Sequence, residues 1–359
     1  FSGIRDWGEQ IFTLLVLEVW ARIVLDRTLD RGAKMDAFLS SPGRGPRTLV
    51  RTLQVGMEWF PELPGGLNRV YYELARHLPD VGVSTHGIVA GAASVLAESQ
   101  GRVEGIAPIE SSLPVRMTAL YRRGRALVRG DTSRLVVSHF PLYTYPLLGA
   151  LNARPLVVHF QGPWALESRT EGHSGLSVAA KLAVERAVYR RATAFIVLSA
   201  PFGRILEQQF GVPADRIHVI PGGVDAARFA IADSRATCRE RLRWPGDRKI
   251  VLAVRRLARR MGLDNLIAAV SHLCEHEPSV LVLVAGVGSI AAELEARIRD
   301  ARVQDHVRLV GFIPDDLLAQ DTVQVVQGLD VLGIGQRQPD AILGNLDGAH
   351  IKQWIVEVF

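Results

Sequence analysis

The stretch IVLAVRRLARRMGLDNLI, residues 250–267, joins a short apolar run to a helical pattern, with four arginines between them. A run of branched apolar residues before such a pattern is typical of a buried strand in a parallel sheet. The arginines then lie at the carboxyl end of a strand and the amino end of a helix, where backbone N–H groups favour an anion. Because a guanidinium can donate two charge-assisted hydrogen bonds to phosphate oxygens, the stretch predicts a diphosphate site. A solvated basic turn is the equal alternative from this stretch alone.

The same rhythm of apolar runs and helical patterns extends over most of the chain. The helical patterns include GLNRVYYELARHL (66–78), LSVAAKLAVERAVYRRA (176–192), 262–275 and 290–301. The apolar runs are TLVRTLQVGM (48–57), RLVVSHF (134–140), PLVVHFQG (155–162), AFIVLSA (194–200), IHVIPGG (217–223), VLVLVAGVGS (280–289) and HVRLVGF (306–312). This alternation predicts an α/β fold of two Rossmann-like halves, joined near residues 221–235, with ligands in the cleft between them.

Composition fits a protein with two cores. The chain has 359 residues, of which 48% are hydrophobic. Two cysteines, Cys238 and Cys274, make neither a disulfide framework nor a metal cluster, so we expect a reducing, cytoplasmic compartment. The apolar run 11–25 is interrupted by Glu18 and Arg22 and is too short to span a bilayer, so we expect a packed helix rather than a membrane-surface helix.

A basic run, residues 115–134, stands out in the first half. The run contains one aspartate and six arginines, which are Arg116, Arg122, Arg123, Arg125, Arg129 and Arg134. A solvated helix face is the simpler interpretation, and docking to anionic lipid headgroups or an acidic acceptor is the alternative. The run lacks the interleaved aromatic residues of a base-stacking platform, so we do not expect nucleic acid as a partner.

Three glycine loops follow predicted strands. They contain Gly65 and Gly66, Gly223, and the pair Gly286 and Gly288. A single loop of this kind is most often a tight turn. Three loops at the ends of strands predict close backbone approach to a ligand.

In their order along the chain, these motifs resemble the family 4 glycosyltransferases of the GT-B type, over about residues 48–319. The motifs that carry the resemblance are the early GG loop, HFQGPWALES (159–168), VIPGGVD (219–225), the arginine turn, VAGVG (284–288) and VRLVGFIPDDLLA (307–319). The resemblance implies a GT-B fold and transfer of a sugar, with retention, from a nucleoside diphosphate donor without a metal or other cofactor. It also implies a sugar, lipid-linked or small-molecule acceptor in polysaccharide, glycolipid or glycoconjugate synthesis.

The resemblance assigns roles to individual residues at the diphosphate. Arg256 falls on the arginine that holds the donor diphosphate in this family. The family's lysine position is Met261, with Arg260 beside it as a substitute cation. Val310 is expected to contact the nucleotide. Cations there would stabilise the charge that develops on the β-phosphate, which can itself accept the acceptor's proton.

On the sugar side, Gln161 stands where the family often has a histidine. Gln161 can bond a sugar hydroxyl but carries no titratable proton. His159 is a second catalytic candidate and His139 lies nearby. A histidine at the end of a strand has either a structural or a catalytic role.

The resemblance divides the chain into four expected segments, of which the donor-nucleotide domain is expected to be incomplete. They are an N-terminal helical extension (1–34), an acceptor domain (48–220), a donor-nucleotide domain (221–319) and an atypical tail (320–359).

Two departures from the family pattern concern the ends of the sequence. Beyond residue 319 the family's pair of glutamates is missing, and Glu357 is the only glutamate there. Residues 1–27 resemble the C-terminal end of an asparagine synthase and lack an initiator methionine. We therefore expect a fused or misjoined reading frame. The alternatives are a genuine two-part protein with an unusual N-terminal helix, a nucleotide-binding remnant without catalysis, and a truncated product.

Overall fold

The structure is a computed structural model that describes residues 50–133, 135–223 and 234–313. The chain separates into two compact units between Gly223 and Val224, and each is described by itself. The predicted extension (1–34), the asparagine synthase resemblance (1–27) and the tail (320–359) lie outside the described residues.

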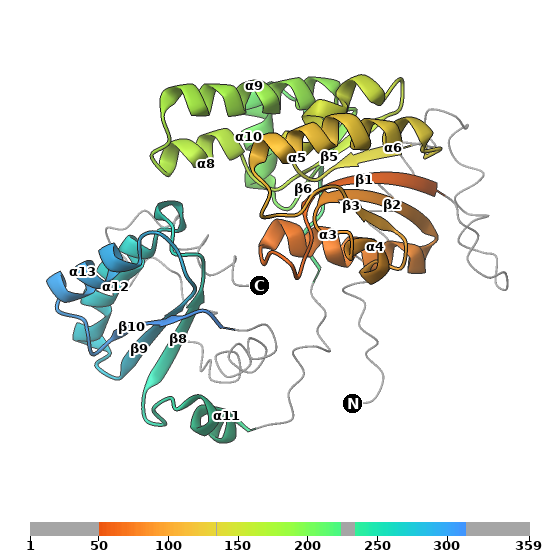
Figure 1. Ribbon diagram of the computed structural model, residues 1–359. Coiled ribbons are helices and arrows are strands. Elements are labelled where there is room, and N and C mark those ends of the chain that lie inside the picture. The colour runs from red at the N-terminus through yellow and green to blue at the C-terminus, as the bar shows by residue number, and fades with distance from the viewer. Residues whose placement is uncertain (1–49, 134, 224–233, 314–359) are drawn as a thin grey trace, which may run out of the picture. The chain divides into compact units, whose positions relative to one another are not determined.

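The first unit is built on a seven-stranded parallel sheet with the order β3-β2-β1-β4-β5-β6-β7 (Figure 1). Its strands are β1 (Val50–Glu58), β2 (Val83–Ala90), β3 (Val103–Gly105), β4 (Leu135–Ser138), β5 (Leu156–Phe160), β6 (Ala194–Val197) and β7 (Ile217–Val219). Its α-helices are α3 (Gly66–His77), α4 (Val95–Glu98), α5 (Leu113–Ala119), α6 (Arg125–Gly130), α7 (Pro141–Thr144), α8 (Trp164–Thr170), α9 (Gly175–Arg191) and α10 (Ala200–Phe210). Shorter helical turns are η1 (Leu78–Val81), η2 (Leu120–Gly124, a π-helix), η3 (Tyr145–Ala150) and η4 (Ala214–Arg216).

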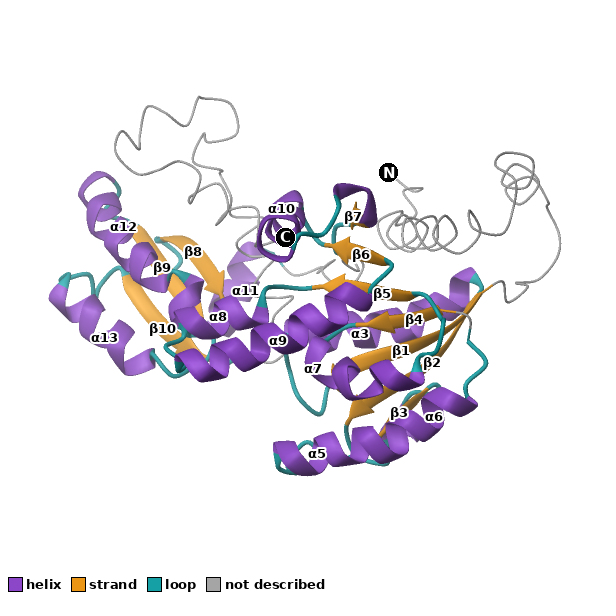
Figure 2. Cartoon of the chain, turned by 90° about the horizontal axis from the view of Figure 1, so that it is seen from above, coloured by secondary structure: helices purple, strands orange, loops and turns teal. Residues whose placement is uncertain are grey.

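Helices cover both faces of this sheet, with α8 and α9 on one side and α3 and α4 on the other (Figures 1 and 2). Alternate residues of one strand point to opposite faces. In β4, Val136 packs in the core cluster that includes Val188 of α9, whereas Leu135 and Val137 pack with Leu74 of α3. The runs buried on both faces explain why these strands have no polar alternation.

The second unit has a three-stranded parallel sheet in the order β10-β9-β8 within the described residues. Its elements are α11 (Arg235–Leu242), β8 (Lys249–Val254), η6 (Arg259–Met261), α12 (Leu263–His276), β9 (Val280–Ala285), α13 (Ala291–Asp300) and β10 (Val307–Gly311). Helices α12 and α13 pack against β9 through one core cluster, and Leu281 and Leu283 face a second, smaller cluster. The predicted α/β fold with Rossmann-like parallel sheets is therefore confirmed.

The strand β8 departs from its predicted burial. Leu252 and Ala253 are buried, but Val251 and Val254 are 37% and 41% exposed. β8 is an edge strand of the described sheet, so it lacks a neighbour on one side. The predicted incompleteness of this unit depends on residues after 313, which lie outside the described part. The cleft expected between the two halves also stays a prediction.

Among the described residues, no helix has the length and hydropathy that crossing a bilayer requires.

Candidate functional site

The carboxyl edge of the first sheet contains a topological switch point. β2 lies on one side of β1 and β4 lies on the other, so the chain leaves these neighbouring strands in opposite directions. Ligands of open α/β sheets bind outside the carboxyl ends of strands at such a point. The structure brings the predicted Gly65 and Gly66 (after β1), His139 (after β4), and His159 and Gln161 (at the end of β5) to this edge. Gly223, exposed beyond β7, ends the unit.

The glycine pair after β1 borders open space. Helix α3 begins at Gly66, and a Cβ added there would meet nothing within 4 Å. A Cβ on Gly65 would meet only the Asn68 Nδ2 atom, at 3.8 Å. Packing against the described residues therefore does not require either glycine, and the space beside the first turn of α3 remains accessible to a ligand.

A buried ion pair that the sequence did not predict lies at this edge. Glu58, the last residue of β1, is 4% exposed and accepts a 3.1 Å hydrogen bond from Arg116 Nη1. The same Nη1 atom lies 2.7 Å from the Tyr143 hydroxyl, and Asn68 Nδ2 donates to the second Glu58 oxygen at 3.4 Å. Burial, together with the Glu58 charge, raises the pKa of Tyr143 to about 12 although Arg116 opposes the shift. Arg116 thus points inward, which corrects its assignment to a basic surface run.

His139 and His159 form a buried pair at the ends of β4 and β5. They are 2% and 3% exposed, and their ring centroids are 5.4 Å apart. His139 Nε2 lies 2.8 Å from Gln54 Oε1. Burial lowers the pKa of His159 to about 4, and burial with the nearby His159 lowers the pKa of His139 well below its usual value. Both rings are therefore neutral near pH 7, which disfavours a charged role for His159 in catalysis.

Gln161 is the half-buried member of this group. Its Nε2 atom lies 3.1 Å from His159 Nδ1. If the amide donates to Nδ1, the neutral His159 carries its proton on Nε2. The Gln161 carbonyl oxygen is then not engaged by His159 and can accept a further hydrogen bond.

The turn after Gln161 is also constrained. Gly162 has a φ of +146°, and a Cβ there would lie 2.5 Å from a Glu167 carboxylate oxygen. The first turn of α8 is held from behind by Glu185, which is fully buried and accepts a 3.2 Å hydrogen bond from the Ala165 N–H. The segment that carries Gln161 is thus fixed at both ends.

In the second unit, three loops at the carboxyl ends of the strands are hydrogen-bonded to one another. Arg255 N donates to Ala285 O at 2.8 Å, and Gly286 N donates to Gly311 O at 2.7 Å. A Cβ on Gly286, whose φ is +145°, would lie 1.9 Å from the Arg255 carbonyl oxygen, and one on Gly288 would lie 2.0 Å from that of Leu257. These glycines are required by packing of loop against loop. Their approach to a ligand stays a prediction. Val310, in the neighbouring β10, is 40% exposed.

The four arginines of the turn separate into different environments. Arg256 is exposed, and its side chain has no hydrogen-bond or ion-pair partner within the described residues. Arg259 binds Glu293 of α13 at 2.7 Å, and Arg260, which is half-buried, has an interaction partner. Met261 packs against the core cluster of α12 and α13. The turn η6 separates Arg256 from α12, which begins at Leu263, within one residue of the predicted start.

Both units match models of known protein families. Residues 64–228 match the family described as Glycosyltransferase Family 4, and residues 234–326 match Glycosyl transferases group 1. A mannosylfructose-phosphate synthase of Agrobacterium fabrum is 29% identical over 163 residues, which are 43% of this chain and 35% of that protein. A second relative is a GDP-mannose-dependent alpha-(1-6)-phosphatidylinositol monomannoside mannosyltransferase of Mycolicibacterium smegmatis. It is 34% identical over 134 residues, which are 34% of this chain and 35% of that protein. The chain thus spans about a third of the length of these curated relatives.

Solved structures agree with these matches at the level of the fold. The HepE protein of Anabaena, solved with UDP and glucose, superposes with a TM-score of 0.59 at 18% identity, covering 77% of this chain and 72% of that one. Sucrose-phosphate synthase of Thermosynechococcus elongatus superposes with a TM-score of 0.60 at 19% identity, covering 77% and 73%. The chain therefore has a GT-B fold, and its two units are similar in sequence to the Glycosyltransferase Family 4 and Glycosyl transferases group 1 models in that order.

Proposed function

We propose that this chain is a glycosyltransferase that moves a sugar from a nucleoside diphosphate donor to an acceptor with retention of configuration. The observation that carries the proposal is the pair of consecutive glycosyltransferase family matches, one over most of the described first unit and one over the second. The GT-B fold and the open space at the β1 and β4 switch point support it.

Arg256 is the proposed ligand of the donor diphosphate. Its guanidinium is exposed and unpaired within the described residues, so no existing ion pair has to break when phosphate binds. Its backbone belongs to a loop that hydrogen bonds fix against the loop after β9. A prepositioned guanidinium stabilises the charge that develops on the β-phosphate as the glycosidic bond breaks. Arg260 is the proposed second cation.

Gln161 is the proposed contact to the donor sugar. Its amide nitrogen is engaged by His159, which leaves the carbonyl oxygen to accept a hydrogen bond from a sugar hydroxyl. The departing phosphate then takes the proton of the acceptor, and the reaction needs neither a metal nor a separate side-chain base.

The similar proteins differ in donor base and acceptor. One relative is named for GDP-mannose and an inositol lipid, and one structural neighbour holds UDP and glucose. We propose a sugar, lipid-linked or small-molecule acceptor in polysaccharide, glycolipid or glycoconjugate synthesis.

Contact with an anionic membrane surface is part of the proposal. Arg122 and Arg123 are exposed on η2, beside Tyr121, which is 56% exposed. Arg125 stacks on the Tyr121 ring, with its guanidinium carbon 4.7 Å from the centroid. An exposed mixture of guanidinium and apolar groups suits a peripheral contact with lipid headgroups.

The proposal is tested by incubating the full chain with UDP-glucose, GDP-mannose and ADP-glucose and measuring release of nucleoside diphosphate. We expect turnover of at least one donor, a loss of at least about 100-fold in Arg256→Ala, and near-normal turnover in Arg259→Ala. Arg259 is a matched control because it lies in the same turn but pairs with Glu293. The anomeric configuration of the product, read by NMR, tests retention. A folded chain that turns over no donor would contradict the proposed transfer.

A second candidate, nucleotide binding without transfer, is favoured by one observation. Met261 occupies the position where the family motif has a lysine, and it packs against the core of the second unit. A cation at that position is therefore absent. Nucleotide binding with no turnover of any donor would select this second candidate.

A further inference from the structure

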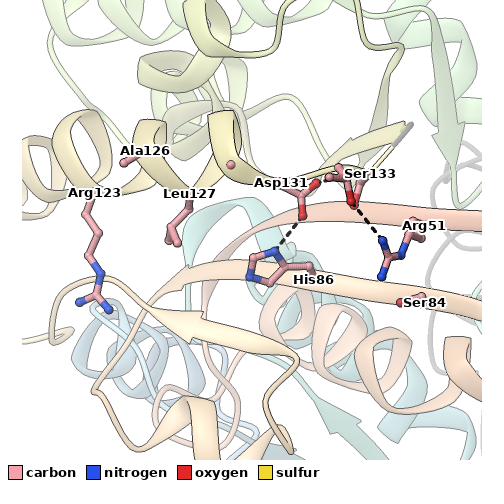
Figure 3. A pocket seen from close by; sticks show the side chains of 10 residues that line it. Arg51, Ser84, His86, Arg123, Ala126, Leu127, Asp131 and Ser133 are labelled. Atoms are coloured by element: carbon pink, nitrogen blue, oxygen red, sulfur yellow. Dashed lines mark hydrogen bonds and ion pairs between the residues drawn. The ribbon is translucent and has the colours of Figure 1, made fainter.

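A pocket of about 610 Å³ opens at the edge of the first sheet opposite the switch point (Figure 3). Its floor is formed by the first residues of β1 and β2, and its walls come from α6 and from the loop that precedes β4. The strands run parallel, so this is the amino edge of the sheet. The volume lies in the range of small-molecule sites, about 300–1,000 Å³. The proposed transfer reaction makes no use of this pocket.

Register places three polar side chains on the pocket floor. Arg51 of β1 is paired with Ser84 of β2, and His86 follows two residues later on the same face. Arg51 Nη1 donates to the Thr132 hydroxyl at 3.1 Å, which leaves its other N–H groups available. The hydroxyl group of Ser84 has no hydrogen-bond partner among the described residues, whereas the Ser133 hydroxyl donates to Asp131.

His86 supplies a further donor. Its Nδ1 atom lies 2.9 Å from Asp131 Oδ2, and its Nε2 atom forms a long ion pair with Glu104 at 3.7 Å, so its N–H can still turn toward a closer acceptor. The hydrogen bond that His86 donates to Asp131 raises the pKa of His86, and the Glu104 charge adds to this shift although burial opposes it. Asp131 is already neutralised, because Arg154 Nη1 lies 3.6 Å from its other oxygen.

The charge in and around the pocket is positive. Three arginines and the titratable His86 face two carboxylates: Arg51, Arg123, Arg154 and His86 against Glu104 and Asp131. Figure 3 shows Arg51 and Arg123 toward opposite sides of the pocket, with His86 between them and the carbon side chains of Ala126 and Leu127 along one wall.

We propose that this pocket binds the phosphate of a small polyol or sugar phosphate, either free or as a lipid headgroup. The phosphate accepts hydrogen bonds from the unused N–H groups of Arg51, from His86 and from the Ser84 hydroxyl. Several convergent donors suit the three oxygens of a phosphate monoester better than the two of a carboxylate. The carbon skeleton of the ligand lies along Ala126 and Leu127.

Calorimetric titration of the full chain with glycerol 3-phosphate tests the free-ligand arm. Co-sedimentation with vesicles of phosphatidic acid, whose headgroup is a phosphate monoester, and phosphatidylcholine tests the headgroup arm. The proposal expects saturable binding in at least one arm, weakened at least tenfold in both Arg51→Gln and Ser84→Ala. Arg129→Gln, an exposed arginine on α6 outside the pocket, should bind as the parent chain does.

Two results would overturn the proposal. One is that neither probe binds to a chain whose circular dichroism is native. The other is that Arg129→Gln weakens binding as much as Arg51→Gln, which would indicate nonspecific attraction to a basic surface. Titrations of the same variants with UDP, GDP and ADP distinguish this site from the donor site, because Arg51→Gln should leave nucleotide affinity unchanged.

Discussion

At the scale of single residues, the buried Glu185 is a carboxylate that supports the α8 turn but is costly to ionise. Burial raises its pKa to about 7, although the N–H groups of Trp164 and Ala165 and the Tyr189 hydroxyl donate to it. A carboxyl whose pKa is higher in the folded than in the unfolded state makes the protein less stable as pH rises through that interval.

Glu185→Gln should therefore stabilise the chain at high pH. As the pH rises from about 4.5 to about 7, the free energy of unfolding of the parent chain should fall by up to about 3 kcal/mol, and that of the variant should not. The glutamine can still accept from the Ala165 N–H. Urea unfolding at about pH 8 and at the lowest pH at which the chain stays folded measures the difference. The exposed Glu207→Gln serves as a control, and a Glu185→Gln effect that is equal at both pH values would contradict the argument.

His159 and Gln161 should act as one unit in transfer. If His159 orients the Gln161 amide toward a sugar hydroxyl, removing either partner loses the same hydrogen bond, worth about 0.5–1.5 kcal/mol. Gln161→Ala and His159→Ala should each lower kcat/KM about threefold to tenfold. The double variant should be little worse than either single variant. Additive losses in this double-mutant cycle would show that His159 acts independently of Gln161.

At the scale of elements, the second unit depends on contact between the loops that follow β8 and β9. Gly286→Ala combines a φ of +145° with a Cβ 1.9 Å from the Arg255 carbonyl oxygen. We expect it to destabilise this unit by at least about 3 kcal/mol. Gly246→Ala, where a Cβ meets nothing within 4 Å, should change stability by less than about 0.5 kcal/mol. Denaturant unfolding compares the two, and a tolerated Gly286→Ala would mean that the loops do not pack as described.

The same elements explain which parts of the fold the sequence could predict. Strands of the first unit are continuous apolar runs because helices cover both faces of its sheet, so their positions follow from local pattern. The exposure of Val251 and Val254 was missed because it depends on the place of β8 in the sheet, which no local pattern records. The inward turn of Arg116 was missed for a similar reason, since its partner Glu58 is 58 residues away.

The candidate site shows the same limit. The family motifs marked Arg256 and Gln161, but the bond between Gln161 and His159 depends on how the end of β5 turns. The sequence marked Gly286 and Gly288 as positions of close backbone approach. Their reason, contact with the backbone of Arg255 and Leu257, required the neighbouring strand to be placed.

At the scale of the whole molecule, the two units have separate cores. The core clusters around Val136 and Leu74 lie in the first unit, and the cluster around Leu294 lies in the second. Val136→Ala and Leu294→Ala should each cost about 2–4 kcal/mol in their own unit. Differential scanning calorimetry should resolve two transitions, with each variant lowering a different one. A single transition lowered equally by both variants would mean that the units unfold together.

The central claim is that this GT-B chain binds a nucleoside diphosphate through Arg256. The most direct measurement is calorimetric titration of UDP, GDP and ADP into the full chain, Arg256→Ala and Arg259→Ala. The account predicts a Kd of about 1 mM or tighter for at least one nucleotide, at least about tenfold weaker binding in Arg256→Ala, and unchanged binding in Arg259→Ala. Equal affinity of Arg256→Ala and the parent chain, or no binding heat from a folded chain, would contradict it.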